Sequence, residues 1–316
     1  MTDEQVDKAE GCFLGQIAGD SLGSLVEFRS AEDIKEQYPN GVRELADGGT
    51  HNTIAGQPTD DSEMAIIMAR SIVDKNGYDI NAVLESYRYW KSTEPFDIGF
   101  TTIMGLTGVP NLDSQANGAL MRVAPIGILG STLGDEETFS MGCNDAHLTH
   151  PHINCVSISG LFAVGIASAI AEDLDNVQLY NKILAVAKRS KCPPMIISVI
   201  EDAKDYKPGN FMKNMGWVMI AFQNALYHLV NTDNVEQAII ETVNDGGDTD
   251  TNGAIVGALL GAFYGRTKIP EQWETSILSC RPKDSKKRKR VKQPRPEVFW
   301  PVDVIELTNN ILNIKS

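Results

Sequence analysis

The feature that most constrains the fold is an acidic, glycine-containing segment that leads directly into an apolar run. Residues 244–265 read NDGGDTDTNGAIVGALLGAFYG, with aspartates at 245, 248 and 250 and no charged residue from 253 to 265. A run this apolar must be buried, whereas isolated carboxylates cost several kcal/mol to bury. The fold must therefore bring compensating positive charge to the start of a buried helix.

Composition places the chain among ordinary globular proteins and excludes several other classes. Of 316 residues, 42% are hydrophobic and 22% are charged, and no uninterrupted apolar stretch reaches the roughly 18 residues of a membrane span. The N-terminus is acidic and polar, unlike a secretory signal. Five cysteines without a CxxC pair indicate reduced thiols and no zinc site. These features predict a cytoplasmic protein that does not contact a membrane.

Charge is distributed unevenly along the chain. The formal net charge is −14, yet KDSKKRKRVK at 283–292 holds seven basic residues and one acidic residue. We expect this segment to form a solvated loop, with a partner contact or a nuclear signal as the alternative. The strongly acidic remainder disfavours nucleic-acid binding and could instead gather cations.

Helical periodicity dominates the sequence. Glycines recur every fourth residue from Gly11 to Gly23, so one face of the first helix is open to close approach by another backbone. No series of short alternating runs and no strand–helix rhythm is present. We therefore predict an all-α fold: a single compact multi-helix domain over residues 1–316, with a basic, proline-containing excursion at about 281–301. The expected helices cover residues 9–27, 60–75, 79–92, 118–131, 155–173, 177–189, 194–204, 214–231, 234–243, 252–264 and 302–314.

Three interpretations compete for the motif GGDTDTNG. Its aspartates and threonines could cap a helix. They also match the start of an EF-hand loop, but position 12 of that loop, which must be a glutamate, would be Leu259. The third interpretation is a metal site at a helix start, where Asp248, Asp250 and Thr251 converge.

A second cluster favours the metal site. In GQPTDDSEMAIIMAR at 56–70, Thr59, Asp60 and Asp61 again stand directly before an apolar helical face. A capping box of Asp60 and Glu63 is the alternative, but adjacent aspartates repel each other unless a positive charge lies between them. Two such clusters predict that the helix starts meet around two divalent cations. Hard oxygen ligands suit Mg²⁺, Mn²⁺ or Ca²⁺ rather than Zn²⁺.

Several motifs in a fixed order carry a family resemblance. They are GCFLGQIAGDSLGSLVEF, GQPTDDSEM, ANGALMRVAPIG, LTHPH and NDGGDTDTNGAIVGALLGAFYG. Together they resemble the ADP-ribosylglycohydrolase family over nearly the whole chain, most closely its bacterial branch of dinitrogenase reductase-activating glycohydrolases and ADP-ribosylarginine hydrolases. The resemblance implies a compact all-α domain that uses two Mg²⁺ or Mn²⁺ ions to remove ADP-ribose from modified proteins.

The resemblance also implies roles for individual residues. Glu27 matches an acid near the metals, and with Asp60 and Asp248 it is expected to be catalytic. The expected metal ligands are Thr59, Asp60, Asp61, Asp248, Asp250 and Thr251. The expected substrate-binding residues are Asn117, Gly118, Met121, Arg122, His150, Gly246, Gly247 and Trp217.

Four of these residues could also have a purely structural role that involves no ligand. Core packing would equally explain Met121 and Trp217. An ion pair would explain Arg122, and a structural hydrogen bond would explain His150.

One departure from the family concerns the leaving group. Where an arginine-specific relative has an aspartate three residues before Asn117, this chain has Ser114, and Asp113 stands one residue earlier. We expect arginine as the leaving group, with Glu27 or Asp113 assisting proton transfer or binding it. Serine-linked, polymeric or O-acetyl conjugates are the alternative substrates. An immunity protein that blocks an ADP-ribosyltransferase toxin is the alternative function.

Overall fold

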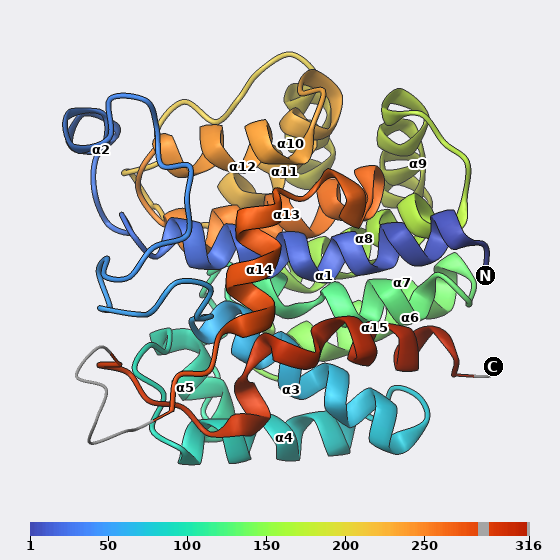
Figure 1. Cartoon of the computed structure of the whole chain (residues 1–316). Helices are drawn as coiled ribbons and strands as arrows, with labels where there is room; N and C mark the ends of the chain where they lie inside the picture. The colour runs from blue at the N-terminus through green and yellow to red at the C-terminus, as the bar shows by residue number, and fades with distance from the viewer. Residues whose placement is uncertain (284–290, 315–316) are drawn as a thin grey trace.

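The computed structural model describes residues 1–283 and 291–314. Within these ranges it consists of helices and loops with only isolated β-bridges, which confirms the all-α prediction (Figure 1). Most of the basic run, 284–290, lies outside the described residues, and with it the solvated-loop prediction. The α-helices are α1 (Asp3–Gly23), α2 (Ala31–Gln37), α3 (Asp60–Lys75), α4 (Ile80–Ser92), α5 (Phe100–Leu106), α6 (Ala124–Gly130), α7 (Asp135–His147), α8 (Ile153–Ala171), α9 (Asn176–Arg189), α10 (Pro194–Ala203), α11 (Val218–Asn231), α12 (Val235–Asn244), α13 (Thr249–Tyr264), α14 (Glu271–Ser279) and α15 (Val304–Leu312).

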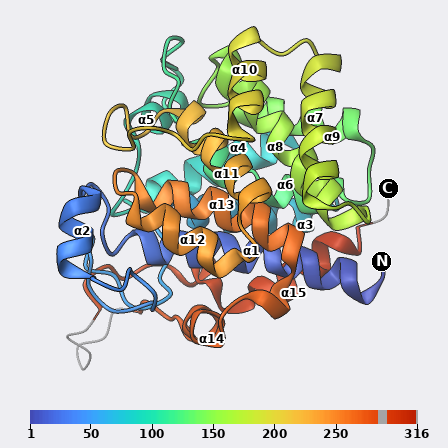
Figure 2. The same ribbon diagram turned by 90° about the horizontal axis from the view of Figure 1, so that it is seen from above.

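Helices α1 and α13 cross the centre of the molecule side by side (Figures 1 and 2). The glycine face of α1 meets a second glycine face on α13, because a Cβ built on Gly19 would lie 2.0 Å from the carbonyl oxygen of Gly253. Gly11 lies opposite Gly261, and Gly23 lies opposite Thr249, so the two helices are antiparallel. The close approach predicted from the glycine spacing is therefore present. It places the end of α1 beside the start of α13.

The remaining helices surround this pair. Figure 1 places α3, α4 and α5 on one side of it and α9 to α12 on the other, with α14 and α15 across the front. Within the described chain, α8 is the one helix long and apolar enough to cross a membrane, and 89% of that stretch is buried inside the protein. Such burial is typical of a core helix.

The start of α3 is capped by a side chain from another helix. Thr59 at the N-cap position makes no side-chain cap of its own. The carboxylate of Asp20 on α1 accepts hydrogen bonds from the backbone N–H groups of Thr59, at 3.1 Å, and Ser62, at 3.1 Å. The capping box considered for Asp60 and Glu63 is absent. The contact from α1 instead ties the acidic start of α3 to the centre of the fold.

The described part of the predicted excursion is anchored to the body of the protein. Arg295 is 7% exposed and donates to both carboxylate oxygens of Glu63 on α3. Its guanidinium also donates to the side-chain oxygen of Thr93 and lies over the ring of Phe299.

One predicted helix, 118–131, is two elements: a 3₁₀ turn at Leu120–Arg122 and helix α6.

Candidate metal and active site

An acid-lined cavity of about 340 Å³ opens where the end of α1 meets the starts of α3 and α13. Carboxylates from all three regions line it, together with Asp97 from the loop before α5. The structure brings most of the sequence-predicted site residues to this cavity. Those among its lining are Glu27, Asp60, Asn117, Gly118, Met121, His150, Asp248, Asp250 and Thr251.

The acids of this cavity are buried close together. Burial, together with repulsion from neighbouring carboxylates, raises the pKa values of Asp60, Asp61 and Asp250 well above the usual range of aspartate. Burial likewise raises the pKa of Asp248 and of Glu27. The described lining contains no lysine or arginine. A bound cation is what would let these groups stay ionised together.

Two residues that were not predicted from the sequence, His51 and Asp97, lie beside Glu27 at the cavity. The Nε2 atom of His51 lies 2.6 Å from Oε2 of Glu27 and 3.4 Å from Oδ2 of Asp97. Burial opposes protonation of His51, but the two carboxylates raise its pKa overall. One ligand atom each from Glu27, His51, Asp97 and Asp250 lies within 4.8 Å of the others. Neither His51 nor Asp97 belongs to one of the sequence motifs, so the residues around them in the sequence do not indicate that they join this acidic cluster.

Thr59 and Asp61 lie behind the cavity lining. The hydroxyl of Thr59 is 2.9 Å from an oxygen of Asp20 and 2.9 Å from Oδ2 of Asp61. The other oxygen of Asp61 is buried and has no hydrogen-bond partner among the described residues. An orphaned carboxylate oxygen beside further carboxylates and hydroxyls fits a hard divalent cation. Asp20, which was not singled out from the sequence, holds this group in place.

Asn117 connects the cleft loop to the acid cluster. Its side-chain amide donates to Oδ2 of Asp248 at 2.7 Å, and its backbone N–H donates to the carbonyl of Gly216 at 3.0 Å. The backbone N–H of Thr251 donates to Oδ1 of Asp250 at 2.9 Å. These contacts orient two acids at the start of α13 without neutralising them.

Comparison with known proteins shows the family of this chain. The model of the ADP-ribosylglycohydrolase family matches residues 1–288. The chain belongs to the ADP-ribosylglycohydrolase family. Proteins of this family are hydrolases of ADP-ribose conjugates.

Two curated relatives and one solved structure illustrate the similarity. The ADP-ribosyl-[dinitrogen reductase] glycohydrolase of Rhodospirillum rubrum is 30% identical, over 86% of this chain and 90% of its own length. An ADP-ribosylarginine hydrolase of Pseudomonas putida is 30% identical, over 88% and 76%. A solved structure titled ADP-ribosylglycohydrolase-related protein complex shares the fold, with a TM-score of 0.79, 23% identity and complete coverage of both chains.

Four predicted substrate-binding residues of this glycohydrolase lie outside the cavity lining. Arg122 is 0% exposed, and its Nε atom is 2.9 Å from Oδ2 of Asp145, so the ion-pair alternative describes its contacts. Gly246 and Gly247 have φ values of +77° and +79° and shape the turn before α13. A Cβ on Gly247 would lie 2.3 Å from the carbonyl of Phe211, so the backbone of Phe211 occupies the space where a side chain would be.

The fourth such residue, Trp217, belongs to an adjoining cavity of about 510 Å³. Its Nε1 atom donates to the side chain of Gln115 at 3.0 Å. Asp113 also lines this adjoining cavity, and Ser114 hydrogen-bonds Thr101 at 2.7 Å. Asp113 was expected to assist proton transfer or bind the leaving group, but it lines the adjoining cavity and is not among the residues that line the acid-lined cavity.

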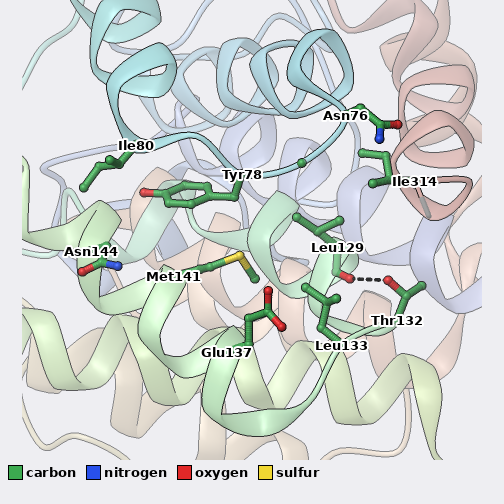
Figure 3. Close-up of a pocket in the computed structure, with 11 residues that line it drawn as sticks. Asn76, Tyr78, Ile80, Leu129, Thr132, Leu133, Glu137, Met141, Asn144 and Ile314 are labelled. Carbon is green, nitrogen blue, oxygen red and sulfur yellow. Dashed lines mark hydrogen bonds between the residues drawn. The ribbon is translucent and has the colours of Figure 1, made fainter. Parts of the chain in front are cut away.

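A larger cavity of about 490 Å³ lies elsewhere, between the α3–α4 loop, α6 and α7 (Figure 3). Its walls are mainly apolar, with Leu129, Leu133 and Met141, and Glu137 is the one carboxylate among its lining residues. A single acid cannot hold paired cations. The smaller, acid-lined cavity is therefore the candidate active site.

Proposed function

We propose that the protein hydrolyses the glycosidic bond at C1″ of protein-linked ADP-ribose, with arginine as the preferred leaving group. The observation that carries this proposal is the convergence of Glu27, Asp60, Asp248 and Asp250 on one cavity whose described lining has no basic side chain other than His150. A cavity of this composition favours cations and cationic leaving groups over free anions.

Two divalent ions, Mg²⁺ or Mn²⁺, would be held by Thr59, Asp60, Asp61, Asp248, Asp250 and Thr251. Bound there, the ions would lower the pKa of coordinated water and stabilise developing negative charge. Asn117 orients Asp248 through its amide hydrogen bond. Glu27 lines the cavity, and Nε2 of His51 contacts its Oε2 atom. In this position the carboxylate of Glu27 would take or return a proton during hydrolysis.

Asp97 is the carboxylate best placed to bind a guanidinium leaving group. Its side chain is 23% exposed and lines the cavity, whereas Asp113 faces the adjoining one. Guanidinium groups bind carboxylates through paired, charge-assisted hydrogen bonds. We therefore assign recognition of the arginine side chain to Asp97 rather than to Asp113.

The direct test is turnover of an arginine-ADP-ribosylated protein in the presence of Mg²⁺ or Mn²⁺. Release of free ADP-ribose should be lost in Asp60→Asn and in Asp248→Asn. The matched control is Asp173→Asn, because Asp173 is an exposed acid that does not line the cavity. Unchanged turnover in either cavity variant would refute the assignment.

Serine-linked ADP-ribose is the second candidate substrate, and Ser114 is the observation that favours it. This chain has Ser114 where an arginine-specific relative has an aspartate, and Ser114 is engaged with Thr101. Side-by-side turnover of arginine-linked, serine-linked, polymeric and O-acetyl conjugates separates the candidates. A blocking complex with an ADP-ribosyltransferase toxin stays a prediction from sequence.

A further inference from the structure

His150 reaches the acid-lined cavity from a buried polar network that includes Arg122, Asp145 and Thr149. Arg122, at 0% exposure, donates from Nε to Asp145 at 2.9 Å and from Nη2 to the hydroxyl of Thr149 at 2.9 Å. The ring of Tyr87 lies 4.5 Å from the guanidinium carbon, and its hydroxyl donates to Asp145 at 2.9 Å. The Oγ1 atom of Thr149 lies 2.7 Å from Nδ1 of His150.

The hydrogen positions in this chain of contacts follow from what each group can donate. A guanidinium has donors and no acceptor, so the Arg122–Thr149 contact uses a lone pair of the Thr149 oxygen. The hydroxyl hydrogen of Thr149 must then find an acceptor. Among the described residues, the one polar atom in hydrogen-bond contact with Thr149 Oγ1 besides Arg122 is Nδ1 of His150. The reverse direction would leave that hydroxyl hydrogen without a partner on a side chain that is 0% exposed.

The ring of His150 is neutral. Burial, reinforced by the nearby charge of Arg122, lowers the pKa of His150 to about 3. A neutral imidazole whose Nδ1 accepts a hydrogen bond carries its single hydrogen on Nε2.

Gly118 keeps this Nε2 atom accessible from the cavity. Both residues line the cavity, and a Cβ on Gly118 would lie 3.1 Å from Nε2. No described residue forms a hydrogen bond with this nitrogen. The N–H group therefore stays available for a ligand.

We propose that Arg122, acting through Thr149, holds His150 as the neutral Nε2–H tautomer, so that the substrate contact expected of His150 from the family resemblance is made by a hydrogen-bond donor. The identity of the ligand rests on the proposed function, whereas the tautomer does not. A nitrogen that carries hydrogen has no lone pair for a metal. Although His150 lines the same cavity as the acids, its protonated Nε2 atom therefore cannot coordinate a cation. Arg122 is a positioning residue and not the ligand contact expected from sequence.

Nitrogen-15 NMR of the uniformly labelled, ligand-free protein tests the tautomer without any assumption about catalysis. Long-range proton–nitrogen correlations distinguish a protonated from an unprotonated ring nitrogen, and His150→Gln identifies the signals of His150. We expect Nε2 to be protonated and Nδ1 to be bare. A protonated Nδ1 in the wild-type protein would overturn the proposal.

Two substitutions at Thr149 test whether its hydroxyl sets the tautomer of His150. Thr149→Val keeps the shape and removes the hydroxyl, so a population with hydrogen on Nδ1 should appear. Thr149→Ser keeps the hydroxyl and should retain the wild-type spectrum, which separates loss of the hydrogen bond from loss of folding. An unchanged, pure Nε2–H pattern in the valine variant would show that Thr149 does not set the tautomer.

Calorimetric titration with ADP-ribose and Mg²⁺ tests the donor role. Thr149→Val should weaken binding roughly tenfold, the order of one neutral hydrogen bond, and Thr149→Ser should bind as wild type does. Equal affinity of the wild type and the valine variant would overturn the donor role. Absence of ADP-ribose binding by the wild type would instead refute the proposed function, and the NMR result would stand by itself.

Discussion

Gly257 of α13 packs directly on Gly15 of α1: a Cβ built on Gly257 would stand 2.0 Å from the carbonyl oxygen of Gly15. No side chain fits in that space, so the two backbones are in contact. The same contact recurs one turn away on each side, at Gly253 and at Gly261. Because both helices are held at this distance, Glu27, just beyond α1, and Asp248, at the start of α13, share one cavity.

Gly257→Ala should therefore destabilise the protein although alanine is the better helix former. Alanine normally gains up to about 1 kcal/mol over glycine inside a helix. Here the methyl group would collide with backbone, and overpacking costs about 1–3 kcal/mol or more. Chemical denaturation measures the change. The control is Gly209→Ala, which has open space, lies in a loop and has a φ outside the left-handed region, and it should be close to neutral. A stabilised Gly257→Ala variant would contradict the packing.

Asp61→Asn should change stability in opposite directions with and without divalent cations. Asp61 is 1% exposed, and burial beside neighbouring carboxylates raises its pKa well above the usual aspartate range, so in chelator the neutral variant should be more stable. In Mn²⁺ the wild type should gain about 2.7 kcal/mol at a concentration one hundred times its Kd, and the variant should gain much less. Thermal unfolding in chelator and in Mn²⁺ measures both. The idea fails if Mn²⁺ stabilises the two proteins equally.

Arg295→Ala should be among the most damaging substitutions outside the active site. It would leave Glu63, at 1% exposure, with a buried charge and no cation, which costs about 3–5 kcal/mol. The comparison is Lys188→Ala, which breaks an exposed pair with Glu201 and should cost about 0–1 kcal/mol. Equal unfolding free energies for the two variants would show that segment 291–303 is not anchored by Arg295.

His228 should make the protein sensitive to mild acid. The side chain is 0% exposed, and burial, with the charge of Lys207, lowers its pKa to about 3, against 6.5 in the unfolded chain. The unfolded state therefore binds a proton first, and stability is lost as pH falls from 6.5 toward 3, by up to about 1.36 kcal/mol per pH unit.

His228→Gln removes this titration. The unfolding free energy of wild type minus that of the variant should therefore decrease as the pH is lowered from 7 to 4. Denaturant titrations at several pH values measure this difference. His147→Gln, at an exposed position, is the control and should keep the wild-type slope. A difference that stays constant with pH would contradict a neutral, buried His228.

Much of the helical architecture could be predicted from local patterns. The apolar face after Thr59 predicts a helix at 60–75, and α3 spans Asp60–Lys75. The predictions missed α2, α5, α7 and α14, because three of these helices are short and α7 has a weak apolar pattern. Helices of this kind are held by tertiary packing more than by their own sequence.

The sequence by itself determined that the protein is helical, that acids precede two buried helices, and that glycines form one face of the first helix. The tertiary structure alone decided which backbone meets that face, that His51 and Asp97 join the acids, and that Arg122 supports His150 from inside the protein. The physical reason is the range of the forces involved. Periodicity and capping act over a few neighbouring residues, whereas electrostatic repulsion and hydrogen-bond satisfaction depend on groups that only folding brings together.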